Sequence, residues 1–197
     1  MSTIPVAGLR LQFCADPGEF LAVAGDYLAA DPVVSTVVTT VAHRLLAQQA
    51  DEIAQPGRNW WLVVRNASAV VGAGMRTAPF APYPPFLLPM PDQAAVALAR
   101  TLHERGEEVL AVNGALPAVD LCAAELTRLG GGQVQVSQYT RLHELGDSTA
   151  AAEIQEHLDQ VTQSIADVDR RALSCLCGFP IQVWLVRIRP TPAQRRR

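Results

Sequence analysis

Between residues 85 and 145 the chain alternates short apolar runs with longer segments whose apolar residues recur at helical spacing. One amphipathic segment opens at Asp92 and runs to Gly106, and a second is entered at Pro117 and ends in the glycines 130–132. The last part alternates apolar and polar residues as a half-buried strand does. The pattern predicts, in chain order, a strand at 87–88, a helix over 92–106, a strand at 109–112, a helix over 117–129 and a strand over 133–145.

Two helices are predicted nearer the N-terminus, and each is opened by an Asp-Pro pair. Asp16 and Asp31 are good N-caps, and the prolines that follow them suit the first turn of a helix. A weak strand over 9–13 precedes the helices, and a hairpin over 60–75 follows them. The proline-dense segment 79–91 is excluded from helix, and we expect it at a sheet edge or in an irregular crossing.

Four stretches of sequence carry a resemblance to a known family. They are VVGAGMRTAPF (70–80), LLPMPDQAAVALA (87–99), LAVNGALPAVDLCAAELTRLGG (110–131) and QYTRLHEL (138–145). Together with the order of the elements, they resemble the GNAT superfamily of acyl-CoA-dependent N-acetyltransferases. They look closest to the N-terminal half of actinobacterial proteins that carry two such domains in tandem. The resemblance implies an α/β fold in which a GNAT-like mixed, mostly antiparallel central sheet is flanked by helices.

The resemblance covers residues 1–146, roughly three quarters of the chain, which we interpret as one GNAT-like domain. The remainder, 147–197, is predicted to be a divergent C-terminal extension. It consists of a helix over 148–173, a short strand at 181–188 and an Arg-rich tail. One interpretation is a helix that docks on the domain. The other, which we prefer, is a remnant left by loss of a second GNAT domain.

Family members bind the pyrophosphate of acetyl-CoA with an Arg/Gln-x-x-Gly-x-Gly/Ala loop at the start of a helix, where backbone N–H groups face the anion. The corresponding join in this chain is Pro89-Met90-Pro91-Asp92-Gln93. It has no glycine, its prolines remove two donors, and Asp92 places a carboxylate where phosphate would lie. An acidic residue there is equally explained by the helix start itself. The resemblance therefore implies a degenerate acetyl-CoA site.

If acetyl-CoA binds, the resemblance assigns its contacts to backbone groups of Leu88 and Met90 and to Asn113. The asparagine matches one that contacts the pantetheine arm in the family, although an Asn-Gly pair is also an ordinary turn. The family often carries a tyrosine general acid shortly before the glycine that ends the next helix. Leu126 stands in its place and has no proton to give, and the neighbouring Thr127 is a poor acid. The catalytic residues are therefore unknown.

The remaining reactive residue types form no recognisable site in the sequence. The four histidines, His43, His103, His143 and His157, are each expected to be structural or solvated. Cys175 and Cys177 form a C-x-C pair with no second pair or histidine at zinc spacing, so we expect no metal. Cys122 lies on the apolar face of a predicted helix and is expected in the core.

The composition narrows the class of protein. With 49% hydrophobic residues in 197, the chain can bury one sizeable core. The net charge of −3 is small and evenly spread, which argues against nucleic acid as a partner despite the Arg-rich end. No run of about 18 apolar residues is long enough to span a bilayer, and no secretory leader is recognisable. We therefore expect a cytoplasmic protein that does not insert into membranes.

Three functions are compatible with these patterns. The first is a GNAT-related domain with a degenerate acetyl-CoA site, weakly active or inactive on its own and without a catalytic sister domain. The second is a working N-acetyltransferase that transfers acetyl from acetyl-CoA to an amine. The third is a non-enzymatic interaction protein. A homodimer in which a second copy covers an exposed sheet edge is also compatible with the sequence. Trp60, Trp61 and Trp184 would then be candidate contacts, although aromatic residues more commonly belong to the core.

Overall fold

The structure is a computed structural model that describes residues 2–6, 8–48, 59–78, 81–142 and 181–189. The strands are β1 (Ser2–Val6), β2 (Leu9–Cys14), β3 (Trp60–Arg65), β4 (Val70–Arg76), β5 (Phe86–Leu87), β6 (Ala111–Ala115), β7 (Gln133–Leu142) and β8 (Ile181–Arg189). The helices are α1 (Pro17–Ala30), α2 (Pro32–Gln48), α3 (Asp92–Glu104) and α4 (Ala118–Gly130).

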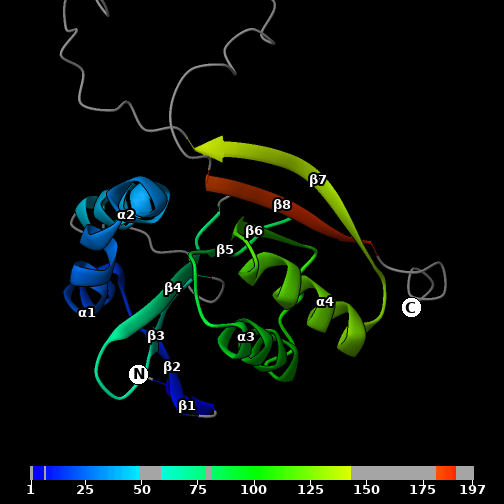
Figure 1. The fold of residues 1–197 in the computed structure, drawn as a ribbon, viewed down its shortest axis with the longest axis horizontal. Coiled ribbons are helices and arrows are strands. Elements are labelled where there is room, and N and C mark those ends of the chain that lie inside the picture. The colour runs from blue at the N-terminus through cyan, green and yellow to red at the C-terminus, as the bar shows by residue number, and fades with distance from the viewer. Residues whose placement is uncertain (1, 7, 49–58, 79–80, 143–180, 190–197) are drawn as a thin grey trace, which may run out of the picture.

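All eight described strands belong to one sheet, in the order β1-β2-β3-β4-β5-β6-β8-β7. Neighbouring strands are antiparallel except β5 and β6, which run parallel. The helices flank this sheet on both faces (Figure 1). The predicted fold class, a mixed and mostly antiparallel sheet flanked by helices, is therefore confirmed. The helix expected over 148–173 lies outside the described residues.

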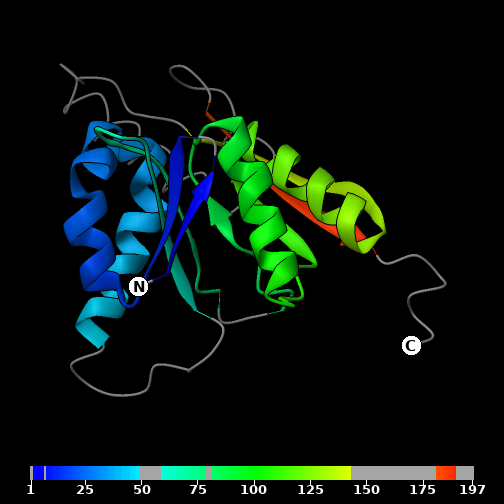
Figure 2. The ribbon, with the colours of Figure 1, turned by 90° about the horizontal axis from the view of Figure 1, so that it is seen from below.

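Helices α1 and α2 cover one face of the sheet, and α3 and α4 cover the other, as Figure 2 shows with the strands running between the two pairs. Each pair packs on its own cluster of buried apolar side chains. The cluster under α1 and α2 includes Phe20, Leu28, Val38, Trp61 and Val63. The cluster under α3 and α4 includes Trp60, Leu62, Leu98, Leu102 and Val119. Because a fully buried side chain of this size contributes about 1.5–3 kcal/mol, these clusters are the main source of stability.

Trp60 and Trp61 lie in these clusters and not on the surface. They are 7% and 3% exposed, and the Trp60 indole N–H donates to Glu107 at 3.0 Å. Of the two interpretations of these tryptophans, the core position is therefore confirmed, and their role as dimer contacts is not supported. The side chain of Trp184 is outside the described part of the structure.

The helix starts follow from the predicted caps. The Asp16 carboxylate accepts a hydrogen bond from the backbone N–H of Glu19 at 2.8 Å, and Asp31 accepts one from Val34 at 3.1 Å. Each bond satisfies one of the first-turn N–H groups that have no intrahelical partner. The predicted starts of α1 and α2 are therefore confirmed, with prolines 17 and 32 in the first turn.

Other elements differ from the sequence expectation. Strand β1 was not predicted. Strand β5 lies in the interior of the sheet, between β4 and β6, and not at its edge. It has only two residues because the prolines around it cannot donate to the neighbouring strands. Asn113 and Gly114 lie within β6, paired with β5 and β8, so reading the Asn-Gly pair as a turn is wrong.

The short strand predicted near the C-terminus is present as β8, and its position is informative. It pairs with β6 over five residue pairs on one side and with β7 over nine on the other. It therefore completes the sheet to which the strands of residues 2–142 belong. No helix in the described part of the chain is both long and apolar enough to cross a membrane.

Candidate functional site

The best-supported candidate site is the join between β5 and α3. The Leu88 amide continues the pairing of β5 and donates to the carbonyl of Ala73 at 2.9 Å. Its side chain is 1% exposed and packs with the α1–α2 cluster. Met90 is 7% exposed, packs with the α3–α4 cluster, and lies so close to Gly72 that a β-carbon there would overlap it. The two predicted contact residues thus point into opposite cores.

Helix α3 begins immediately after this join. Pro91 is its N-cap residue and supplies no side-chain hydrogen bond, while its carbonyl accepts from the amides of Ala94 at 2.8 Å and Ala95 at 3.3 Å. The amides of Asp92 and Gln93 are left as first-turn N–H groups without an intrahelical acceptor. The Asp92 carboxylate stands at the positive end of the helix dipole, where it stabilises α3 by roughly 0.3–1 kcal/mol.

Tyr27 closes the join from the side of α1. Its hydroxyl donates to the carbonyl of Pro89 at 2.7 Å, across 62 residues of sequence. Burial, reinforced by the charge of Asp31, raises the pKa of the Tyr27 phenol to about 12, so it is a weak acid at neutral pH. Sequence reasoning missed this residue because it reads as one more position on the apolar face of α1.

Asn113 faces β5 across the parallel pair. The backbone N–H of Asn113 donates to the carbonyl of Pro85 at 2.8 Å, and the asparagine residue is half-buried. The next residue, Gly114, has φ +132° and packs against the backbone of Leu87, whose nitrogen would lie 2.6 Å from a β-carbon there. Strands β5 and β6 are therefore in close contact at the point where the family resemblance places the pantetheine arm.

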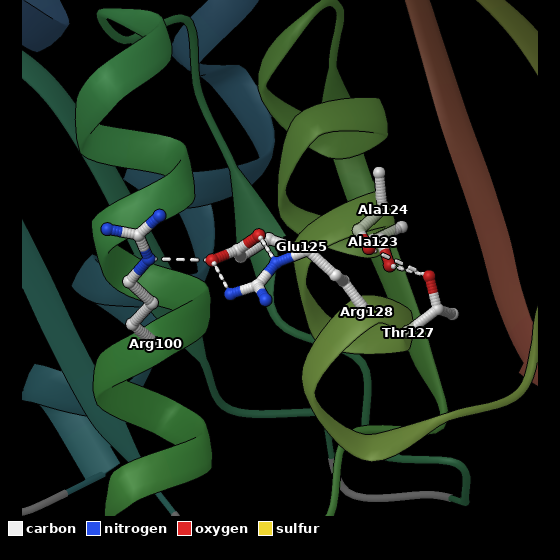
Figure 3. A network of polar contacts seen from close by, with 6 residues as sticks. All are labelled: Arg100, Ala123, Ala124, Glu125, Thr127 and Arg128. Atoms are coloured by element: carbon white, nitrogen blue, oxygen red, sulfur yellow. Dashed lines mark hydrogen bonds and ion pairs between the residues drawn. The ribbon is translucent and has the colours of Figure 1, made fainter.

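The other candidates lie apart from the join. Thr127 donates to the carbonyls of Ala123 at 3.1 Å and Ala124 at 2.8 Å, and it points away from Glu125 on α4 (Figure 3). Leu126 is buried at 8% exposure. His43 and His103 are exposed and His143 and His157 fall outside the described residues, so the two that can be placed do not converge on the join.

Figure 3 shows an ion network between α3 and α4. The Glu125 carboxylate accepts from Arg128 at 2.6 Å and 2.8 Å and from Arg100 at 2.6 Å. These bonds, from Arg128 first and Arg100 second, lower the pKa of Glu125 to about 2. Both arginines pair with the one carboxylate of Glu125, so the network joins the two helices.

A second network holds the far end of β4. The Arg76 guanidinium donates to Glu107 at 2.9 Å and to the carbonyls of Tyr83 and Glu108 at 3.0 Å and 2.7 Å. Trp60 donates to the same Glu107 carboxylate. Each of the three guanidinium nitrogens of Arg76 makes a hydrogen bond within the protein, which indicates a structural role.

The thiols that the structure describes are buried and separate. Burial, with smaller contributions from Glu19 and Asp16, raises the pKa of Cys14 to about 11, and burial alone raises that of Cys122 to about 12. Among the described residues no group of His, Cys, Asp or Glu is placed to hold a metal ion. Cys175 and Cys177 lie outside that part of the chain.

Comparison with known proteins finds no matching family model and no matching curated protein. One similar solved structure is an acetyl transferase from Salmonella typhimurium that modifies the N-terminal serine of a 50S ribosomal subunit protein. It is 11% identical, covers 95% of this chain and 99% of that chain, and has a TM-score of 0.40. Another, assigned as an acetyltransferase of Salmonella typhimurium and solved with acetyl-CoA, is 16% identical over 94% and 95%, with a TM-score of 0.32. The chain is thus similar, at low identity, to two acetyltransferase structures.

Proposed function

We propose that this chain is a GNAT-related domain with a degenerate acetyl-CoA site, weakly active or inactive on its own. The observation that carries the proposal is the β5–α3 join. The Leu88 amide is already donated to Ala73, the prolines at 89 and 91 have no N–H, and Asp92 adds a negative charge. A pyrophosphate requires several converging N–H groups and no competing carboxylate, so the residues present do not fit it.

The direct test is calorimetry of the purified chain with acetyl-CoA. We expect no saturable binding up to about 1 mM, a level that would reveal a binding free energy of about −4 kcal/mol. The Asp92→Asn variant tests the effect of the Asp92 charge on binding apart from the effect of the missing proline N–H groups, because it removes the carboxylate and leaves the backbone unchanged. Saturable micromolar binding by the natural chain would contradict a degenerate site.

A working N-acetyltransferase is the second candidate, and one observation favours it. The Asp92 and Gln93 amides at the start of α3 have no side-chain cap and remain available as anion donors. Under this alternative, acetyl-CoA would bind and free CoA thiol would be released when amines are added. Asp92→Asn would then tighten cofactor binding, since the repulsion between carboxylate and phosphate would be gone.

Three further features of the proposal rest on sequence and sheet geometry. The four stretches quoted for the resemblance support a relationship to the N-terminal half of actinobacterial tandem-GNAT proteins, and a cytoplasmic location is proposed because the sequence has no apolar run long enough to span a bilayer. Within the described sheet, β1 and β7 are the two edge strands, and the unpaired backbone groups of such an edge could pair with a second copy in a homodimer. Light scattering after size exclusion measures this directly, and a monomer mass at all concentrations would exclude the homodimer.

A further inference from the structure

A cavity of about 340 Å³ lies on the sheet away from the β5–α3 join, over β1, β2 and the end of β3. Its lining residues are Thr3, Arg10, Gln12, Arg65, Asn66 and Ala67. None of the six is acidic. The volume falls at the lower end of the roughly 300–1,000 Å³ that is typical of small-molecule sites.

The two cationic groups of the cavity are brought together by strand register. Arg10 of β2 is the Cα partner of Arg65 of β3 in an antiparallel pair, so both side chains stand side by side on one face. By strand alternation this is the face that carries Cys14 and Val63, on which α1 and α2 pack. Like charges directly opposite each other destabilise a sheet.

Neither guanidinium is neutralised within the described part of the chain. The ion pairs there involve four other arginines, at positions 76, 100, 105 and 128, and none reaches Arg10 or Arg65. Both residues are exposed. An anion between them would convert the repulsion into two charge-assisted interactions.

Gln12 adds a polar group to the cavity. The residue is 9% exposed, and its side-chain amide has no hydrogen-bond partner among the described residues and is not one of the buried unpaired groups there, so it faces the solvent of the cavity. It lies on the same strand face as Arg10, two residues away, and lines the cavity. Its amide is therefore free to pair with an occupant.

We propose that this cavity binds the phosphate group of a small molecule. Two guanidinium forks, the Gln12 amide and the Thr3 hydroxyl present more donors than the about four lone-pair sites of a carboxylate can accept. A phosphate offers more acceptor oxygens and a larger charge, and arginine forks match its geometry. The site stands on its own evidence and does not depend on the acetyl-CoA proposal.

The test is calorimetry of the whole chain with inorganic phosphate at constant ionic strength and neutral pH. We expect saturable binding at one site, weakened by about tenfold or more in Arg10→Gln and in Arg65→Gln, which each lose a charge-assisted bond. Arg65→Lys keeps the charge but loses the fork, and should also weaken binding. The matched control is Arg44→Gln, an exposed arginine of α2 outside the cavity, which should bind as the natural chain does.

Four results would overturn the proposal. They are an absence of saturable phosphate binding, an equal loss of affinity in Arg44→Gln, equal or tighter binding of acetate, and unchanged affinity in both cavity variants. A thermal melt of each variant without phosphate shows whether a loss of affinity is caused by misfolding. Because a like-charge pair is removed, Arg65→Gln should then melt no lower than the natural chain. A lower melting temperature in a variant whose affinity is unchanged would identify a purely structural arginine.

Discussion

Gly114 is the residue on which the close contact of β5 and β6 depends. Its φ of +132° is disfavoured for other residues, and a β-carbon there would overlap the carbonyl of Leu87. We expect Gly114→Ala to lower the free energy of unfolding by about 2–4 kcal/mol, measured by denaturant titration. Gly25→Ala is the matched control. Nothing lies within 4 Å of its added methyl group, so this helix-interior change should stabilise by about 0.5–1 kcal/mol.

Glu125 makes stability depend on pH in the acid range. Its pKa falls from the ordinary 4.5 to about 2 in the folded chain, so its contribution is fully present above about pH 4.5 and is lost as the pH falls towards 2. Glu125→Gln should remove this dependence, with the two proteins converging near pH 2, as urea titrations across that range would show. Glu104→Gln, on the exposed side of α3, is the control and should leave the natural dependence in place.

The two described thiols should be nearly inert in the native chain. A pKa of about 11 for Cys14 and about 12 for Cys122 lowers the thiolate fraction by about 100-fold or more, and burial adds a steric block. Iodoacetamide at pH 8, followed by peptide mass spectrometry, should modify both only after unfolding in urea. Modification of either residue at the unfolded rate in native buffer would contradict the buried positions.

At the scale of elements, local chemistry was sufficient to predict the helices. The caps Asp16 and Asp31 predict the starts of α1 and α2. The apolar spacing after Asp92 and Pro117 predicts α3 and α4. Both signals are local, because caps and helical periodicity are properties of neighbouring residues. The hairpin β3–β4 was also predictable, because two apolar runs joined by a short turn are a local pattern as well.

Pairing over long distances has no such local signal. Nothing near residue 181 indicates that β8 inserts between β6 and β7, and nothing near Tyr27 indicates its bond to Pro89. The β5–α3 join was predicted as a strand-to-helix boundary, but the burial of Leu88 and Met90 in opposite cores depends on the helices packed there. Asn113 was misread as a turn because β5 and β8 override the Asn-Gly preference.

The Tyr27 hydrogen bond ties α1 to the β5–α3 join, and its removal is a test at this scale. Tyr27→Phe keeps the ring and deletes the hydroxyl, leaving the Pro89 carbonyl without this donor. We expect a loss of about 1 kcal/mol in unfolding free energy, together with faster amide exchange around Leu88. Tyr27→Leu, which also removes ring contacts, should cost more. Equal stability of Tyr27→Phe and the natural chain would show that the bond is not formed.

At the scale of the whole molecule, the sheet separates two cores that are closed by different helix pairs. The α1–α2 core rests on β2, β3 and β4, whereas α4 contacts β6, β7 and β8. The second half of the sheet therefore depends on a strand that arrives from beyond residue 180. Continuity of the sheet, and not the order of the chain, decides which residues form one folded unit.

The fragment 1–146 tests this dependence and the domain boundary drawn from the sequence. Among the strands that the structure describes, β7 pairs only with β8, and β6 pairs with β8 on its side opposite β5. Without 181–189, β7 has no partner strand and β6 becomes an exposed edge, since an isolated strand cannot satisfy its backbone groups. Hydrogen exchange should show protection retained in β2, β3 and β4 but lost over 133–142, and the fragment should aggregate more readily than the full chain. Protected amides in β7 of the fragment would instead establish 1–146 as a self-sufficient domain, with β8 dispensable to its sheet.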